Sequence, residues 1–577
     1  MISWYLSSFL LICCLATLSG ETLILPKEAH QLTPVQQQYE YLLIAFRQSL
    51  GEEKRPAQQL TVEATDQKDK LSTTLSLSLP TQTEMALELM SQLDTPTYAL
   101  ENRALFEPAT WQSLRLIDQE PSVLSGIAPE MQTLLGKIFL ARLLTTPIID
   151  VQRIQTRQAA IQALCENPSV LADIISICGT IKQIQEQLLG LTSKEHPLYD
   201  KGLRIYQHEF FFRSFGPRGN KRWNRVAKMF GDIWYGAGII ALPMLNIKGI
   251  LGYAHTSKEE IESKFNVDHR VVAATLATLI AYNAGIQLPG FIAWIRARFK
   301  AMNYFYDALT PLKVFFTATQ RLKEYFDQNP ALQCLGDEID ITLTINHPQV
   351  KKLRDIVMGK AFNSRTSAHI LGGDLILIID LLRNCHKSIL KGIGIVGAFD
   401  AYSSLASWYL KSQNSEEKPL CFATFVEGTG RPVLEIQNFW HVLSRGTPVL
   451  NSIKLGENNP QNAIITGIFE SGKSTVLQSI ALNVLCAQSI GIGLARSYTA
   501  TPYSSINIYA NIKDDLANDR SLFKTELYRA LQLLVHIKQM PSGHFSFTIA
   551  DATFTGTEAD AGQAAAYAVT RYLGELP

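Results

Sequence analysis

The chain has 577 residues, of which 46% are hydrophobic and 18% charged, and its formal net charge is +1. This length predicts about three or four domains with enough apolar material for sizeable cores. The balanced charge excludes a global electrostatic attraction to nucleic acid, because that attraction needs an excess of Lys and Arg. The 8 cysteines form no C-x-x-C pair or Cys/His cluster, so we interpret them as reduced and mostly buried thiols.

The first part of the chain contains two kinds of segment. Within the segment 1–22, residues 1–20 are largely apolar and end in the small residues Thr17, Ser19 and Gly20, as at the cleavage site of a signal peptide. The positively charged start of such a peptide is missing, so an uncleaved membrane anchor and a plain buried helix remain as alternatives. Residues 23–99 form a variable region, in which the polar stretch 52–83 is typical of a flexible linker.

The middle of the chain contains two long apolar segments, residues 229–253 and 271–295. The second has no charged residue, which makes it long enough to cross a bilayer. Basic residues flank both outer ends, and the positive-inside rule then predicts a membrane hairpin at 229–295 with cytoplasmic flanks. The alternatives are two buried core helices or, for the basic cluster at 213–228, a surface for nucleic-acid phosphates.

The clearest motif lies near the end of the chain, where residues 467–475 read G-I-F-E-S-G-K-S-T. This is a complete phosphate-binding loop, G-x-x-x-x-G-K-[ST]. It follows an apolar run, residues 463–466, which we predict as a buried strand, and precedes a predicted helix at 476–487. In such a loop, backbone N–H groups surround phosphate oxygens, Lys473 reaches the β/γ-phosphates and the Ser474 hydroxyl binds Mg²⁺.

Two further segments accompany this loop. Residues 545–551 form an apolar strand that ends in Asp551, the pattern that supplies a Mg²⁺ ligand in P-loop proteins. Residues 514–526 read D-D-L-A-N-D-R-S-L-F-K-T-E, and Gly556, Thr557 and Gly562 follow the aspartate strand. This ordered set resembles the ATPase domain of the MutS family, in which the segment reads D-D-L-x-x-x-x-S-x-F-x-x-E.

The resemblance implies a shared nucleotide site. It implies ATP or ADP with Mg²⁺ as cofactors, with the metal held by Ser474 and Asp551. It also implies a homo- or hetero-dimer formed through the ATPase domain, and DNA as a partner. The implied nucleotide-binding residues are Gly467, Ser471, Gly472, Lys473, Ser474, Thr475 and, acting in trans on the γ-phosphate of the partner subunit, Ser521.

Upstream segments carry the resemblance further, at residues 105–114, 136–157, 394–408 and 432–441. They look like the helical core of the family and the entry to its ATPase domain. The implied fold is multidomain, with an α-helical core domain followed by an α/β P-loop NTPase domain of ABC type and candidate transmembrane helices between. The predicted domains are a signal-like or anchor segment at 1–22, a variable region at 23–99, the first core half at 100–200, a helical insertion at 201–345, the second core half at 346–430 and the ATPase domain at 431–577.

The chain departs from the family pattern in several places. Ala552 follows Asp551 where the family has a glutamate that orients the attacking water, so no catalytic residue is assigned and we expect weak or absent hydrolysis. Phe469 and Glu470 replace Asn and Met in the loop. The sequence also ends at Pro577, before the family's sensing histidine and dimerising helix-turn-helix, and it lacks the mismatch-reading domain.

These observations lead to three hypotheses about function. The first is a MutS-like ATP-binding protein that binds DNA and is related to mismatch repair. The second is a membrane-tethered nucleotide-binding module that signals by dimerisation without DNA, and the third is a truncated remnant. We expect a membrane-associated protein with its ATPase domain in the cytoplasm, or alternatively a cytoplasmic one.

Overall fold

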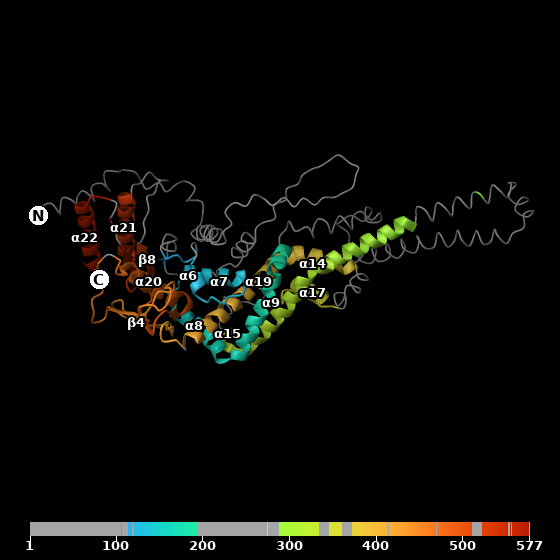
Figure 1. The fold of residues 1–577 in the computed structure, drawn as a ribbon, viewed down its shortest axis with the longest axis horizontal. Coiled ribbons are helices and arrows are strands. Elements are labelled where there is room, and N and C mark those ends of the chain that lie inside the picture. Colours follow the sequence, from blue (N-terminus) through green and yellow to red (C-terminus); the bar gives the residue numbers. More distant parts are fainter. Residues whose placement is uncertain are drawn as a thin grey trace, which may run out of the picture. The chain divides into compact units, whose positions relative to one another are not determined.

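The computed structural model is mostly helical with small sheets (Figure 1). It divides into two compact units, one made of residues 1–183, 321–342 and 391–577 and the other of 184–320 and 343–390. The boundaries of the six predicted domains stay predictions. The structure describes residues 105–106, 114–117, 121–192, 274, 288–333, 346–359, 372–413, 415–468, 470–509, 522–551, 554 and 557–575.

Helices α6 (Val123–Gly126), α7 (Leu134–Thr145) and α8 (Val151–Glu166) of the first unit begin where the sequence offers capping side chains. Thr133 caps α7 by accepting the Gly136 N–H at 2.9 Å, and Asp150 caps α8 by accepting the Arg153 N–H at 3.2 Å. These bonds satisfy backbone donors that a helix N-terminus leaves unpaired, so they locate both helix starts.

A buried aspartate extends the cap of α7. Asp400 lies in α19 (Gly372–Gln413) and is 1% exposed. Its carboxylate accepts the N–H and the hydroxyl of Thr133, both at 2.6 Å, and the Gln132 N–H at 3.2 Å. Burial raises the pKa of Asp400, and the Thr133 bonds oppose that rise. Gly136 allows this approach, because a Cβ there would lie 2.5 Å from the carboxylate oxygen.

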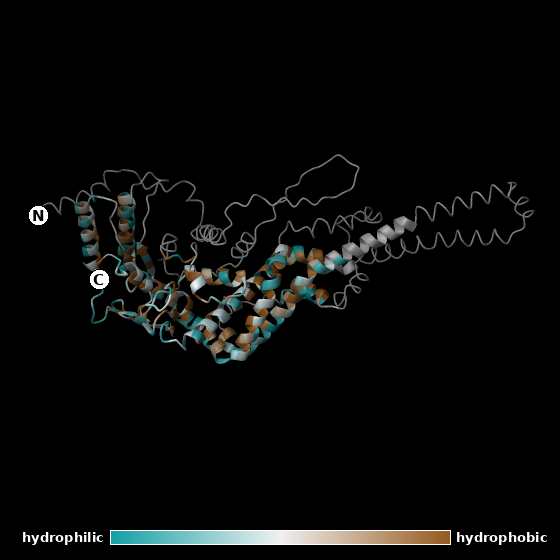
Figure 2. Ribbon diagram, in the orientation of Figure 1, coloured by the Kyte–Doolittle hydropathy of each residue, from teal (hydrophilic) through white to brown (hydrophobic). Residues whose placement is uncertain are grey.

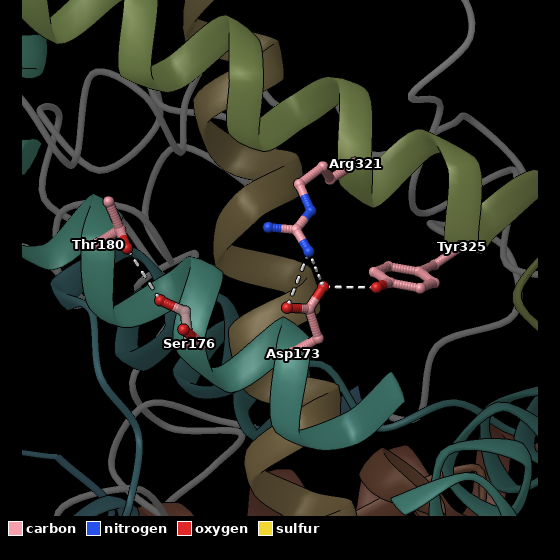
Figure 3. A network of polar contacts seen from close by, with 5 residues as sticks. All are labelled: Asp173, Ser176, Thr180, Arg321 and Tyr325. Carbon is pink, nitrogen blue, oxygen red and sulfur yellow. Dashed lines mark hydrogen bonds and ion pairs between the residues drawn. The ribbon is translucent and has the colours of Figure 1, made fainter. Parts of the chain in front are cut away.

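A polar network joins α9 (Pro168–Thr192) to the C-terminal part of α14 (Leu288–Gln328) in the same unit (Figure 3). Arg321 donates to both carboxylate oxygens of Asp173, at 2.9 and 3.1 Å, and the Tyr325 hydroxyl donates to the same carboxylate. The Arg321 side chain is 54% exposed, so solvent screens the ion pair and its contribution to stability is small. The network therefore orients the two helices more than it stabilises them.

The second unit is built from the remaining parts of α9, α14 and α19 together with α17 (Pro348–Val357). Pro348 stands at the first turn of α17, where its missing N–H is not needed. The buried residues Val350, Leu353 and Val357 follow helical spacing, so α17 packs one apolar face inward. In Figure 2, hydrophobic and hydrophilic residues alternate along the described helices.

Three small sheets lie in the first unit. The first has strand order β1-β8-β9, all parallel, with β1 at Leu105–Phe106, β8 at Ser505–Tyr509 and β9 at Ser546–Ala550. The second pairs β2 (Cys421–Phe422) with β6 (Ile492–Gly493). The third has the order β3-β7-β4-β5, and its strands are Thr424–Phe425, Ser497–Ala500, Leu434–Phe439 and Asn451–Leu455.

Three helices accompany these sheets. Helix α20 (Lys473–Ile490) packs against α7, α8 and β6, and α21 (Leu522–Gln539) lies beside α22 (Ala559–Glu575), as Figure 1 shows. A short helix, α15 (Pro330–Gln333), packs on α8. The helix predicted at 476–487 is therefore confirmed within α20, and the strand predicted at 545–551 is confirmed as β9.

The strand predicted at 463–466 is wrong. These residues have no regular secondary structure, and the side chain of Ile464 is 78% exposed. A strand forms only where a neighbouring strand pairs with its backbone, and the described strands β8 and β9 pair with each other and with β1 instead. Apolar composition alone therefore misled the prediction.

Two predictions about compartment fall largely outside the described residues. The segment at 1–22 is not described, and of the hairpin at 229–295 only residue 274 and the start of α14 are. Among the described helices, Leu381–Gln413 is long and apolar enough to cross a membrane, and 94% of its apolar 18-residue window is buried inside the protein. A bent pair, Val151–Glu166 with Pro168–Leu191, passes the same test of length and composition only when taken together.

The five cysteines in the described part of the chain are free thiols, as predicted. Cys178, Cys385 and Cys486 are buried, and the other two are half-buried. Burial raises the pKa of the Cys385 and Cys486 thiols to about 12, which makes both unreactive.

Candidate nucleotide-binding site

The loop at residues 467–475 turns directly into α20. Gly472 precedes the helix with φ +87°, a left-handed conformation that glycine adopts without strain. Glu470 has φ +62°, which costs a non-glycine residue about 1 kcal/mol or more. The Ser471 N–H donates to the Ile468 carbonyl at 3.3 Å and closes the turn. The loop thus keeps a tight, partly strained geometry immediately before the helix N-terminus.

The Lys473 side chain folds back over this loop. Its ammonium group donates to the carbonyl oxygens of Gly467 at 3.0 Å and Ile468 at 2.7 Å. The positive charge therefore lies beside the curled backbone, at the first residue of α20. Ser474 and Thr475 follow in the exposed first turn, where backbone N–H groups point out of the helix end.

Helix α20 is exposed at its start and buried at its end. Every residue from Ser479 to Ile490 is buried, and no acidic residue lies in the first turn. An anion at the N-terminus would meet the positive end of the helix dipole without a competing carboxylate in that turn. The buried half of the helix holds this end in place.

A cluster of buried amides and a guanidinium fixes the far end of α20 to the helical part of the unit. Gln488 donates to the carbonyls of Ile148 at 3.0 Å and Tyr503 at 2.9 Å, and it accepts the Tyr503 N–H at 2.9 Å. From α8, Gln158 donates to the carbonyls of Ala423 and Gly491, both at 2.8 Å, and Arg157 donates to that of Ser489. We call Arg157, Gln158 and Gln488 the polar anchor.

Sequence reasoning found only one member of the polar anchor. Arg157 belonged to the segment that resembles the family core, while Gln158 and Gln488 carried no motif. Gln158 bonds to Gly491, 333 residues away along the chain, and Gln488 bonds to Ile148, 340 residues away, so no local pattern predicts these two contacts. Only the resemblance of the whole core segment pointed to this region.

His441 is a second contact of α20. Its Nδ1 accepts the Leu443 N–H at 3.1 Å. Burial lowers the pKa of His441, and a hydrogen bond with Gln478 of α20 opposes that shift. His441 therefore joins the segment after β4 to the first half of α20.

Asp551 lies immediately after β9. Its N–H donates to the Tyr509 carbonyl at 2.8 Å, which continues the parallel pairing of β8 and β9 by one residue. Carboxyl ends of parallel strands meet at one edge of a sheet, where ligands are commonly bound. No cluster of three or more His, Cys, Asp or Glu among the described residues could hold a metal by itself. A single carboxylate at this edge fits Mg²⁺, which usually takes one or two carboxylates with phosphate and water oxygens.

Comparisons with known proteins identify this region. Residues 463–576 match the family model described as MutS domain V. This stretch, about a fifth of the chain, is therefore similar to MutS domain V. The chain is 30% identical over 196 residues to the DNA mismatch repair protein MutS of Desulfitobacterium hafniense, a match covering 34% of this chain and 21% of that protein.

Two further relatives show how much of the chain is shared. MutS of Halothermothrix orenii is 22% identical over 494 residues, which cover 83% of this chain and 52% of that protein. The DNA mismatch repair protein MSH6 of Arabidopsis thaliana is 30% identical over 186 residues, 32% of this chain and 13% of that protein. The chain thus spans about half, or less, of the length of these relatives.

The predicted site residues lie on distinct elements of one compact unit. Gly467, Ser471 and Gly472 form the loop, Lys473 to Thr475 form the first turn of α20, and Asp551 ends β9. All of these lie within the stretch that matches domain V. Ser521 and Ala552 lie outside the described residues, so their predicted roles stay predictions.

Proposed function

We propose that the chain binds ATP or ADP with Mg²⁺ at residues 467–475, as the nucleotide-binding module of a MutS-like protein. The observation that carries the proposal is the position of Lys473 at the start of α20, with its ammonium group over the loop carbonyls of Gly467 and Ile468. The match of residues 463–576 to domain V supports the same assignment.

The residues divide the binding task by their chemistry. The N–H groups of the loop and of the first turn of α20 donate to phosphate oxygens, and Lys473 neutralises charge at the β/γ-phosphates. The Ser474 hydroxyl and the Asp551 carboxylate are the protein ligands for Mg²⁺. Glu470, exposed at the rim of the loop, keeps its negative charge in solvent.

Hydrolysis is weak in this proposal because Ala552 has no carboxylate with which to orient water. The protein then acts by binding nucleotide, and the bound nucleotide changes the association of its subunits. The resemblance supports a dimer in which Ser521 contacts the γ-phosphate bound by the partner, and a role in DNA transactions related to mismatch repair. The names of the relatives support that class and not a particular DNA substrate.

Calorimetric titration of the protein with MgATP tests the proposal. Lys473→Ala should weaken ATP binding by at least about a hundredfold, since it removes charge-assisted contacts to phosphate. Lys538→Ala, at an exposed lysine of α21, is the matched control and should bind like the wild type. Equal affinity of the Lys473→Ala and Lys538→Ala proteins would show that the loop does not hold the phosphates.

A membrane-tethered form of the same module is the second candidate. It rests on the uncharged segment 271–295 and on the basic residues outside the hairpin at 229–295. In this form the ATPase region faces the cytoplasm. Washing membranes with alkaline carbonate tests it, since a spanning hairpin stays in the pellet and full release into the supernatant refutes the hairpin.

A further inference from the structure

Two residues of the segment that resembles the family's D-D-L-x-x-x-x-S-x-F-x-x-E pattern have no task in the proposed function. They are Phe523 and Glu526, both in α21. The Glu526 carboxylate is 4% exposed and its Oε1 accepts the Phe554 N–H at 2.9 Å. The ring of Phe523 meets the ring of Phe554 edge to face, with centroids 6.2 Å apart. Both side chains thus contact the same residue.

Phe554 adopts a backbone conformation that needs outside support. Its φ is +61°, in the left-handed region that a bulky side chain rarely occupies. The ring is nevertheless buried, with 6% exposure. A residue held in this region persists only where the surroundings over-determine it. Here the bond from Glu526 and the ring of Phe523 supply that support.

Helix α22 constrains Phe554 from a second direction. A Cβ added at Gly562 would lie 2.5 Å from the Phe554 carbonyl oxygen, so the helix backbone passes very close to it. The N–H of Phe554 is therefore held by α21 and its carbonyl lies against α22. Neither backbone group can move without disturbing a helix.

The held residue is three positions after Asp551. The N–H of Asp551 is tied to the Tyr509 carbonyl at 2.8 Å, so the short segment between Asp551 and Phe554 is fixed at both ends. A displacement of Phe554 would act on the backbone position of Asp551, because three residues of chain span at most about 10 Å. Burying the Glu526 carboxylate costs free energy, which the bond to Phe554 helps to offset.

We propose that Phe523 and Glu526 form a clamp on Phe554 that positions Asp551 for Mg²⁺. They are positioning residues that do not touch the nucleotide themselves. The inference rests on the proposed function for the identity of the ligand. It gives Phe523 and Glu526 a positioning role that is separate from the γ-phosphate contact of Ser521. Its consequence is specific: loss of the clamp weakens the metal-dependent part of ATP binding and leaves the metal-free part unchanged.

The test compares ATP affinity in excess Mg²⁺ with ATP affinity in EDTA, by calorimetry on the full chain. In Glu526→Leu the ratio of the two affinities should fall about tenfold, the size expected for one hydrogen bond to a charged group. Glu526→Gln should keep the wild-type ratio, because its amide oxygen still accepts the Phe554 N–H. Lys524→Ala, at an exposed neighbour in α21, is the matched control.

A second variant and the wild-type protein separate failure of the clamp from failure of the proposed function. Should Glu526→Leu fail to fold, Glu526→Asp keeps the charge but shortens the reach, and the same fall in the ratio is expected. A wild-type ratio in the folded Leu or Asp variant overturns the clamp, whatever happens to the melting temperature. Absence of ATP binding by the wild type, with or without Mg²⁺, instead overturns the proposed function and the metal role with it.

Discussion

The polar anchor allows a sharp prediction at Gln158. Its amide donates to the carbonyls of Ala423 and Gly491, both at 2.8 Å, and its side chain is 8% exposed. Replacement by leucine keeps nearly the same shape, so the cavity term is small and the loss of hydrogen bonds dominates. Gly491 fits closely here, because a Cβ at that residue would lie 2.5 Å from the Gln158 Cγ.

The expected loss of stability depends on the hydrogen bonds that each of the two carbonyl oxygens keeps in the variant. The Gly491 carbonyl also accepts the Ala423 N–H at 2.9 Å, so it loses one of two bonds, at about 0.5–1.5 kcal/mol. The Ala423 carbonyl loses the buried donor that Gln158 supplies, at about 1–3 kcal/mol. The opening free energy of this region should therefore fall by about 1.5–4.5 kcal/mol in Gln158→Leu.

Hydrogen exchange measures this opening locally, which matters because unfolding of a multidomain chain is not two-state. The Ala423 amide is the reporter, and its protection factor should fall by roughly tenfold or more. Gln155→Leu, an exposed position in the same helix, is the control and should change local stability by about 0.5 kcal/mol or less. Equal protection in the two variants would refute the anchor.

Three other predictions concern the cap of α7 and the chemistry of the site. Gly136→Ala should destabilise the protein by about 1–3 kcal/mol, because the new Cβ meets the Asp400 carboxylate. Gly179→Ala is the control and should be neutral or stabilising, because a Cβ there has no other atom within 4 Å. The denaturant midpoints of the two variants measure the difference in stability. Because burial raises the pKa of Asp400 in the folded chain, its contribution to stability is full at low pH and is lost as pH rises through that raised value. Asp400→Asn should remove this part of the pH dependence, as unfolding measured across the acidic range would reveal, and an unchanged profile would contradict the assignment. Ala552→Glu should raise phosphate release from ATP by on the order of a hundredfold, and brisk hydrolysis already present in the wild type would mean that another residue orients the water.

The sequence by itself determined the features that depend on short stretches of chain. Residues 467–475 and the helix after them are local, because a loop that ends in Gly472-Lys473 needs only a few residues to turn and start a helix. The strand before Asp551 is also predictable, since its apolar residues alternate with Ser546 and Thr548 at the spacing of a strand. The similarity of residues 463–576 to MutS domain V agrees with the order of such segments along the chain.

Only the tertiary structure decided which distant groups meet. The apolar run 463–466 reads as a strand but is exposed and unpaired with any described strand, because pairing depends on neighbours that its own residues do not encode. Gln158 and Glu526 carry no signal of their partners, since a buried amide or carboxylate is specified by the backbone groups around it. Those groups lie 333 residues away for the Gln158 bond to Gly491 and 28 residues away for the Glu526 bond to Phe554. Hydrogen bonds in a buried interior must be satisfied by whichever groups folding brings together, and that is decided by the packing of whole elements.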